Sequence, residues 1–173
     1  MDFEENIKHL TPFFQQHGFT ISDAWKNYMQ YNSDTVSVIF SYDEREKSFS
    51  TFAGRKHGQS VLLSFDVIEN IFSESLDIYN GNSIADREIH FFSGQGKGLL
   101  TGDVTTLNRL EKYSELEAKR YTDDLVSRQK ISLADKAWNN KEYLDFIKFL
   151  AELDKNSLPK SYSKKYEIAL KKL

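Results

Sequence analysis

One stretch, residues 35–54, constrains the fold of this chain more than any other. In its first arm, polar and apolar residues alternate with a period of two, which is typical of a half-buried β-strand. The apolar set on one face is Val36, Val38, Phe40 and Tyr42. Five consecutive charged residues follow, at positions 43–47, and they must lie in water because burying them would be too costly. The stretch therefore predicts a β-hairpin with a charged, exposed tip.

The flanking segments predict a helix before the hairpin and further strands around it. Apolar residues recur at helical spacing from Phe3 to Phe14, with Asp2 as a cap and Gly18 as a stop. Pro12 either kinks this helix or begins a second short one. We expect one aromatic-rich strand over residues 19–31, a short apolar strand over 61–63, and a helix capped by Ser64 or Asp66. Residues 88–92 predict a further strand.

The second half of the chain predicts helices only. Asp103 begins the first helix, Ser132 the second, residues 142–153 form the third, and Pro159 introduces the last. The last two helices are amphipathic and should pair antiparallel. The fold class is therefore α+β: an N-terminal helix, a small antiparallel sheet and a helix, followed by an all-helical C-terminal part.

A glycine-rich run divides these two halves. We expect an α+β head over residues 1–92, a flexible linker over 93–102 and a helical tail over 103–173, which pack as one domain or form two. The run SGQGKGLLTG is not a phosphate-binding loop, because Lys97 is followed by glycine instead of serine or threonine.

Composition excludes several classes of protein. None of the 173 residues is a cysteine, which excludes disulfides and thiol nucleophiles and suits a reducing compartment. No run of 18 apolar residues occurs, and residues 1–14 show no secretory signal, so we expect a cytoplasmic protein that does not associate with membranes. No G-x-S-x-G nucleophile motif is present.

Charge is distributed unevenly along the chain. Residues 1–102 hold 8 Lys or Arg and 14 Asp or Glu, whereas residues 103–173 hold 15 and 12, so the head is at −6 and the tail at +3. The mixed signs of the tail argue against nucleic-acid binding. The acidic head suits a basic protein partner, although two ordinary solvated faces would give the same count.

One set of residues could form a chemical site. Asp86, Glu88 and His90 alternate, and on a strand they would project from one face, where two carboxylates and an imidazole could bind a divalent metal or act as general acid and base. The wet face of an edge strand gives the same pattern.

Two resemblances bear on function. The segments AWNNKEYLDFIKFLAEL and LPKSYSKKYEIALKKL resemble one tetratricopeptide-type helix pair, with packing residues at Trp138, Tyr143, Leu150, Tyr166 and Ala169. An aromatic-rich α+β head with a charged hairpin and a helical tail also resembles small bacterial toxin-immunity proteins. That resemblance implies a protein-binding role.

These observations favour a non-enzymatic, cytoplasmic protein-binding module without a cofactor, such as an immunity-type inhibitor of a toxin. The expected contact residues are those of the hairpin tip: Asp43, Glu44, Arg45 and Glu46. One alternative is a metal-dependent enzyme or ligand-binding protein that uses Asp86, Glu88 and His90. Another is a structural module that forms homo-oligomers through helices over residues 113–131 and 162–173.

Overall fold

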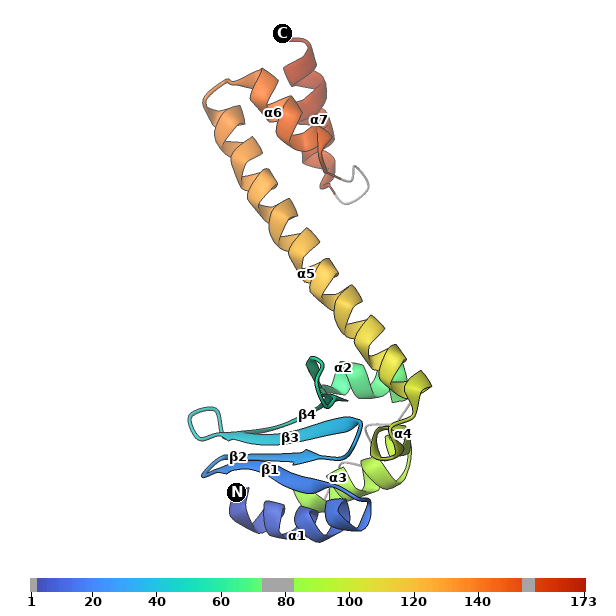
Figure 1. Cartoon of the computed structure of the whole chain (residues 1–173). Coiled ribbons are helices and arrows are strands. Elements are labelled where there is room, and N and C mark those ends of the chain that lie inside the picture. Colours follow the sequence, from blue (N-terminus) through green and yellow to red (C-terminus); the bar gives the residue numbers. More distant parts are fainter. Residues whose placement is uncertain (1–2, 73–82, 154–157) are drawn as a thin grey trace. The chain divides into compact units, whose positions relative to one another are not determined.

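A computed structural model of the chain describes residues 3–72, 83–153 and 158–173, and it has the predicted α+β architecture (Figure 1). The chain divides into two compact units, Met1–Glu115 and Leu116–Leu173. The first unit contains the sheet and the helices that cover it, and the second is helical. We describe each unit by itself.

The sheet has five strands in the order β1-β2-β3-β4-β5, and every neighbouring pair is antiparallel. The strands are β1 (Thr20–Trp25), β2 (Tyr28–Asn32), β3 (Val36–Asp43), β4 (Ser48–Arg55) and β5 (Ser60–Leu62). The predicted hairpin is confirmed as β3 and β4, which pair from Val36 with Arg55 to Asp43 with Ser48. The prediction of one strand over residues 19–31 is wrong, because a turn at Lys26 and Asn27 divides this segment into β1 and β2.

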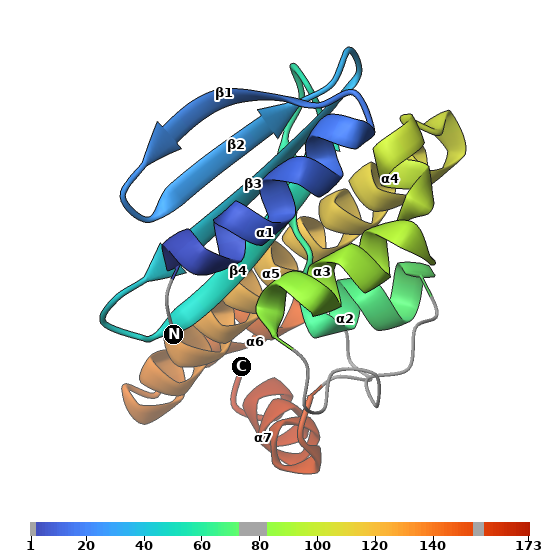
Figure 2. The same ribbon diagram turned by 90° about the horizontal axis from the view of Figure 1, so that it is seen from below.

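Helices of the first unit cover one face of this sheet. They are α1 (Phe3–Gln16), α2 (Phe65–Val67), the π-helical turn η1 (Ile68–Phe72), α3 (Ile84–Ser93), α4 (Lys97–Thr101) and the beginning of α5 (Val104–Asn139). Figure 2 shows α1 in front of the sheet, running along the direction of the strands, with α3 beside it. The fully buried ring of Phe14 is at the centre of this layer and contacts Tyr31, Phe40 and Phe92, with ring centroids 5.0 to 5.5 Å apart. Each such side chain contributes about 1.5–3 kcal/mol by leaving water.

Helix α1 is continuous through Pro12, so the alternative of a second short helix beginning there is wrong. Ile7 and Leu10 before the proline and Phe14 after it are all buried on one face. We attribute the continuity to this shared burial, which offsets the hydrogen bond that the proline nitrogen cannot donate. The predicted cap at Asp2 lies outside the described residues.

The prediction of a strand over residues 88–92 is wrong, because this segment belongs to α3. Ser83 caps the helix, since its Oγ accepts a hydrogen bond from the backbone N–H of Asp86 at 3.1 Å. Ile84 and Phe91 are seven residues apart and both are buried, as are Ala85 and Phe92. This helical spacing of apolar residues, and not the alternation of polar ones, determined the local structure.

The predicted flexible linker over residues 93–102 contains a helix instead. Leu99 and Leu100 of α4 are buried in the core of the first unit. Gly98 packs so closely against Thr106 that a Cβ atom there would collide with its Oγ1, and Gly102 ends α4 at a φ of +68°. The glycines therefore serve close packing and a left-handed turn, and the division between the units lies after Glu115, inside α5.

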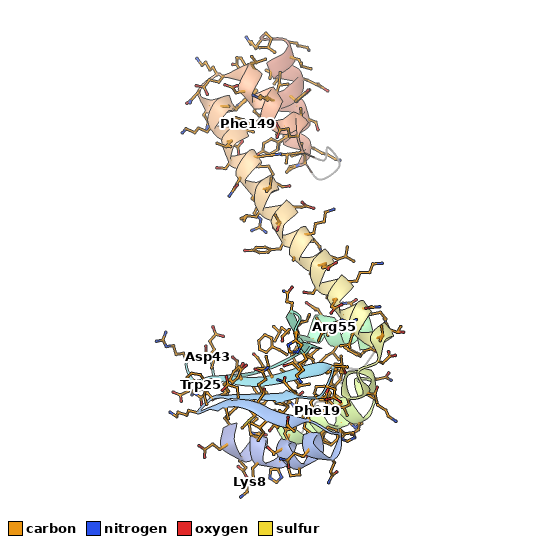
Figure 3. The ribbon with its side chains drawn as sticks, viewed as in Figure 1. Lys8, Phe19, Trp25, Asp43, Arg55 and Phe149 are labelled. Carbon is orange, nitrogen blue, oxygen red and sulfur yellow. The ribbon has the colours of Figure 1, made fainter. Side chains whose placement is uncertain are left out.

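Helix α5 begins as predicted but ends later. The Asp103 carboxylate accepts hydrogen bonds of 2.7 Å from both the backbone N–H and the hydroxyl of Thr106, which confirms the cap. Arg55 of β4 donates to Glu111 and Asn108 and so ties the beginning of α5 to the sheet (Figure 3). The predicted start of a new helix at Ser132 is wrong, because α5 continues to Asn139.

The C-terminal unit packs the end of α5 against α6 (Tyr143–Ala151) and α7 (Lys160–Leu170). Pro159 precedes α7, as predicted. The buried residues of this unit are Ala134, Ala137, Phe146, Leu150, Leu153 and Ala169. Trp138 contacts Tyr143 and Phe146 with ring centroids 5.7 and 5.1 Å apart, so these side chains have the packing role expected of them. Among the helices of the described ranges, none has the length and apolar character needed to cross a membrane.

Candidate protein-interaction surface

Two turns lie together at one end of the sheet, where Figure 3 labels Trp25 and Asp43. The backbone N–H of Tyr42 donates to the carbonyl of Asn27 at 2.9 Å, which joins the β3–β4 hairpin to the β1–β2 turn. Glu44 Oε1 accepts from Asn27 Nδ2 and from Lys26 Nζ, both at 2.9 Å. The hairpin tip is therefore held against the neighbouring turn.

The four predicted contact residues have different roles in this tip. Asp43 Oδ1 accepts the backbone N–H groups of Arg45 at 2.7 Å and Glu46 at 3.1 Å, so its carboxylate organises the turn. The hydrogen bond from Asn27 and the ion pair with Lys26 lower the pKa of Glu44. The side chains of Arg45 and Glu46 are exposed. Hence Glu46 presents its negative charge at the surface, the charge of Glu44 is paired with Lys26, and Asp43 mainly shapes the backbone.

The sheet face opposite the helices carries an apolar row. Because residues paired across antiparallel strands share a face, Ile39, Phe52 and Leu62 are neighbours on this side. Ile39 and Phe52 are half-buried and Leu62 is 43 % exposed. The next pair on this face, two residues further along β3 and β4, is polar and consists of Ser41 and Ser50.

Trp25 and Tyr28 extend this face to the strand edge. The two residues pair across β1 and β2, and the Trp25 side chain is 71 % exposed. The Tyr28 hydroxyl donates to Gln30 Oε1 at 2.8 Å, and Gln30 Nε2 donates to Ser37 Oγ at 3.0 Å. The exposed tryptophan, the apolar row and the hydrogen-bonded polar side chains between them share one face of the sheet, and this composition is typical of a protein-interaction surface.

Sequence reasoning missed the role of Trp25 because it placed residues 19–31 in one strand. In the observed arrangement, the turn at Lys26 and Asn27 brings Trp25 to the edge of the sheet, next to the hairpin tip. The alternation of β3 did indicate that Ile39 faces away from Val38 and Phe40. Which side chains lie next to Ile39 on that face depends on strand pairing, and the alternation within one strand does not specify the pairing.

The structure does not assemble the predicted site at Asp86, Glu88 and His90. On a helix, residues two apart point about 200° away from each other, so Glu88 cannot share a face with the other two. The Asp86 carboxylate instead accepts a 2.7 Å hydrogen bond from Ser83 Oγ at the helix cap. Across residues 3–72, 83–153 and 158–173, no group of three or more His, Cys, Asp or Glu side chains could hold a metal ion.

The C-terminal unit contains a polar cluster that links α5 and α7. Asp135 of α5 accepts hydrogen bonds from the Tyr162 hydroxyl at 2.6 Å and from Lys165 Nζ at 3.3 Å. Lys165 Nζ also lies 5.5 Å from the centroid of the Trp138 ring. The cluster joins two packed helices, and we regard it as structural.

No protein-family model, curated protein sequence or solved structure matches this chain.

Proposed function

We propose that this protein is a non-enzymatic, cytoplasmic protein-binding module whose N-terminal unit binds a basic protein partner. The observation that carries the proposal is the exposed Trp25 at the sheet edge, next to the hairpin tip and on the same face as Ile39, Phe52 and Leu62. Large aromatic side chains contribute much of the affinity at protein interfaces. The absence of cysteine is compatible with the cytoplasm.

Charge supports a basic partner over an acidic one. Residues 1–115 contain 10 Lys or Arg and 17 Asp or Glu, a net charge of −7. Such a field accelerates association with a basic protein and disfavours nucleic acid. In this proposal Glu44 and Glu46 orient the approaching partner, and Trp25 supplies contact area once it has docked.

The class of partner follows from the resemblance to toxin-immunity proteins. A toxin would be bound and inhibited by occlusion of its active surface, which requires no catalytic group on this chain. In an activity assay of the toxin, this protein should therefore compete with the substrate of the toxin for that surface.

The first experiment is affinity purification with the tagged full-length protein from an extract of its source organism, followed by a salt wash. We expect one stoichiometric protein partner with a basic isoelectric point. The binding of this partner to the Trp25→Ala variant should be weaker by tenfold or more, about 1.4 kcal/mol. The matched control is Leu144→Ala, which removes another exposed apolar side chain, 65 % exposed, from the C-terminal unit. Equal binding by wild type and Trp25→Ala would contradict the proposed surface.

A second candidate function is self-association through α5. Four large side chains in its middle section are between 41 and 72 % exposed: Leu116, Tyr121, Leu125 and Val126. Sedimentation velocity over a wide range of protein concentration tests this candidate. A constant monomer mass would exclude it, and a dimer that Tyr121→Ser and Leu125→Ser abolish would support it.

A further inference from the structure

A groove in the N-terminal unit lies where β5 ends and β4 continues towards the hairpin tip. Within the described residues, strand β5 pairs with Phe52, Ala53 and Gly54 alone, whereas β4 begins at Ser48. A cavity of about 230 Å³ opens beside this unpaired part of β4. Its lining includes Phe49, Thr51, Leu63, Phe65, Ile68 and Glu88.

The backbone of β4 presents hydrogen-bonding groups to this groove. The N–H of Leu63 donates to the carbonyl of Thr51 at 2.8 Å, so the carbonyl of Thr51 points to the β5 side of the strand. Residues two apart in a strand have the same orientation, so the N–H and C=O of Phe49 point to that side as well. In the described part of the chain, no strand residue pairs with Phe49 on this side. The edge therefore offers one donor and one acceptor to an added strand.

The cavity lies where a side chain of such a strand would point. Phe49 faces the core, because its ring packs against Phe3 and Phe40 with centroids 5.9 and 5.8 Å apart. A residue opposite Phe49 on an added antiparallel strand would share this face. Leu63 and Ile68, which are 8 and 7 % exposed, provide an apolar floor for its side chain.

The size and polarity of the cavity indicate one side chain rather than a free small molecule. Its volume exceeds the roughly 150 Å³ of a cavity that accommodates benzene and is below the roughly 300 Å³ at which pockets for drug-sized ligands begin. Thr51 is 5 % exposed and its Oγ1 has no hydrogen-bond partner.

The charge of the N-terminal unit favours a basic occupant. Glu88 lies in the wall of the groove, and Glu46 lies at the tip towards which β4 runs. The cations nearby are Arg87 in the wall and Lys47 at the start of β4. Arg45 also lies at this tip, so the charges beside the unpaired edge are of both signs, and the net charge of −7 over residues 1–115 gives charge complementarity to a Lys- or Arg-rich segment.

We propose that this groove binds a short, extended, basic segment of the protein partner by strand addition to β4. The backbone of the segment pairs with Phe49, and one apolar side chain fills the cavity above Leu63 and Ile68. This mode of recognition combines main-chain hydrogen bonds with one side-chain pocket. The inference rests on the proposed function, since it assigns to the partner the segment that enters the groove.

The test is a selection of short random peptides displayed on phage against the full-length protein. The comparison protein is the double variant Phe65→Ser, Glu88→Lys, which changes two residues of the groove lining, Phe65 being 59 % exposed, and adds a repulsive charge. Circular dichroism and a thermal melt show whether this variant is folded. The control variant Leu144→Arg makes the same type of change in the C-terminal unit.

We expect enriched peptides to contain an apolar residue with Lys or Arg at alternating positions. A synthetic copy should bind wild type and Leu144→Arg about equally and the double variant at least about tenfold more weakly. Bound peptide should slow hydrogen exchange at the backbone N–H of Phe49. The proposal is overturned if no peptide is enriched on wild type relative to the double variant, or if exchange at Phe49 is unchanged by bound peptide.

The same variants separate this inference from the proposed function. Peptides that bind in the groove while no protein partner exists would support the groove and contradict the function. A partner whose binding depends on Trp25 but is unchanged in the double variant would support the function and contradict the groove.

Discussion

The hydroxyl of Tyr162 in α7 donates a 2.6 Å hydrogen bond to Asp135 Oδ2 in α5. Lys165 Nζ lies 3.3 Å from the other oxygen of the same carboxylate. The two donors come from one helix and the acceptor from another, so the cluster fixes the rotation of α7 about its axis. The packing of Ala169, which is fully buried in this unit, depends on that rotation.

Replacing Tyr162 by Phe should destabilise the C-terminal unit by about 1 kcal/mol. The variant loses a hydrogen bond to a charged acceptor at a partly solvated site, while the ring is kept. Urea denaturation monitored by tryptophan fluorescence measures the change, since Trp138 lies in the same cluster. Tyr121→Phe is the control, because Tyr121 is 72 % exposed, and it should leave the free energy of unfolding unchanged.

The same contact predicts a dependence of stability on alkaline pH. Burial and the hydrogen bond to Asp135 raise the pKa of Tyr162 from its usual 10.0 to about 12. The folded state thus favours the neutral phenol, and its stabilising contribution is complete below pH 10 and is lost as the pH rises through 12. The stability advantage of wild type over Tyr162→Phe should disappear across this interval. A difference titration of tyrosinate absorbance between the two proteins checks the assignment, and a Tyr162 that titrates at the usual value would contradict it.

Gly102→Ala should destabilise the N-terminal unit by more than Gly18→Ala. Both glycines have positive φ, +68° and +82°, which costs an L-residue about 1 kcal/mol. A Cβ at Gly18 would meet nothing, whereas one at Gly102 would collide with Thr35 Oγ1. Thr35→Ala in the Gly102→Ala background should remove the excess, and thermal melts of the wild type and the three variants measure it. Equal destabilisation by the two glycine substitutions would show that the Thr35 contact relaxes freely.

Two buried hydroxyls on the sheet should respond to removal in opposite directions. Thr51 Oγ1 has no hydrogen-bond partner, so Thr51→Val should stabilise the protein by about 1 kcal/mol through the loss of an unsatisfied buried group. Ser37 is 2 % exposed and its Oγ accepts from Gln30 Nε2, so Ser37→Ala should destabilise it by a similar amount. Urea denaturation gives both values. Destabilisation by Thr51→Val would indicate that this hydroxyl is satisfied in solution.

The hairpin tip should influence the rate of partner association more than protein stability. The double variant Glu44→Gln, Glu46→Gln removes two negative charges and should slow association and flatten its salt dependence. Asp43→Asn is the control, because the amide oxygen can still accept the N–H groups of Arg45 and Glu46. Stopped-flow measurements at several salt concentrations compare the three proteins. Unchanged association in the double variant would place the electrostatic contact elsewhere.

Local signals in the sequence were sufficient where one physical effect dominated. The alternation of Val36, Val38 and Phe40 predicted β3 and its inward face, because a strand beside a core must bury every second residue. Asp103 and Ser64 were recognisable as caps, since short polar side chains satisfy the free N–H groups of a first helical turn. The charged segment 43–47 could only be an exposed turn, because burying five charged side chains would be too costly.

Local signals failed where two patterns coincided or where glycine had two uses. Residues 86–90 alternate in polarity, but the wider spacing of Ile84 and Phe91 makes this segment helical. The glycines of residues 93–102 suggested flexibility, yet Gly98 is required by its contact with Thr106, a residue of another helix. Thr106 is only eight residues from Gly98, but their contact depends on the turn between α4 and α5, which residue spacing does not specify.

The sequence by itself determined the fold class, the β3–β4 hairpin, its charged tip and the helical nature of the second half, because these follow from periodicity and from the cost of burying charge. Only the tertiary structure decided that Trp25 lies beside that tip, that Ile39 neighbours Phe52 and Leu62, and that β4 continues past β5 beside a cavity. These features arise from strand pairing and from packing between segments distant in the chain. Such pairing depends on the free energy of the whole unit and not on any one stretch of residues.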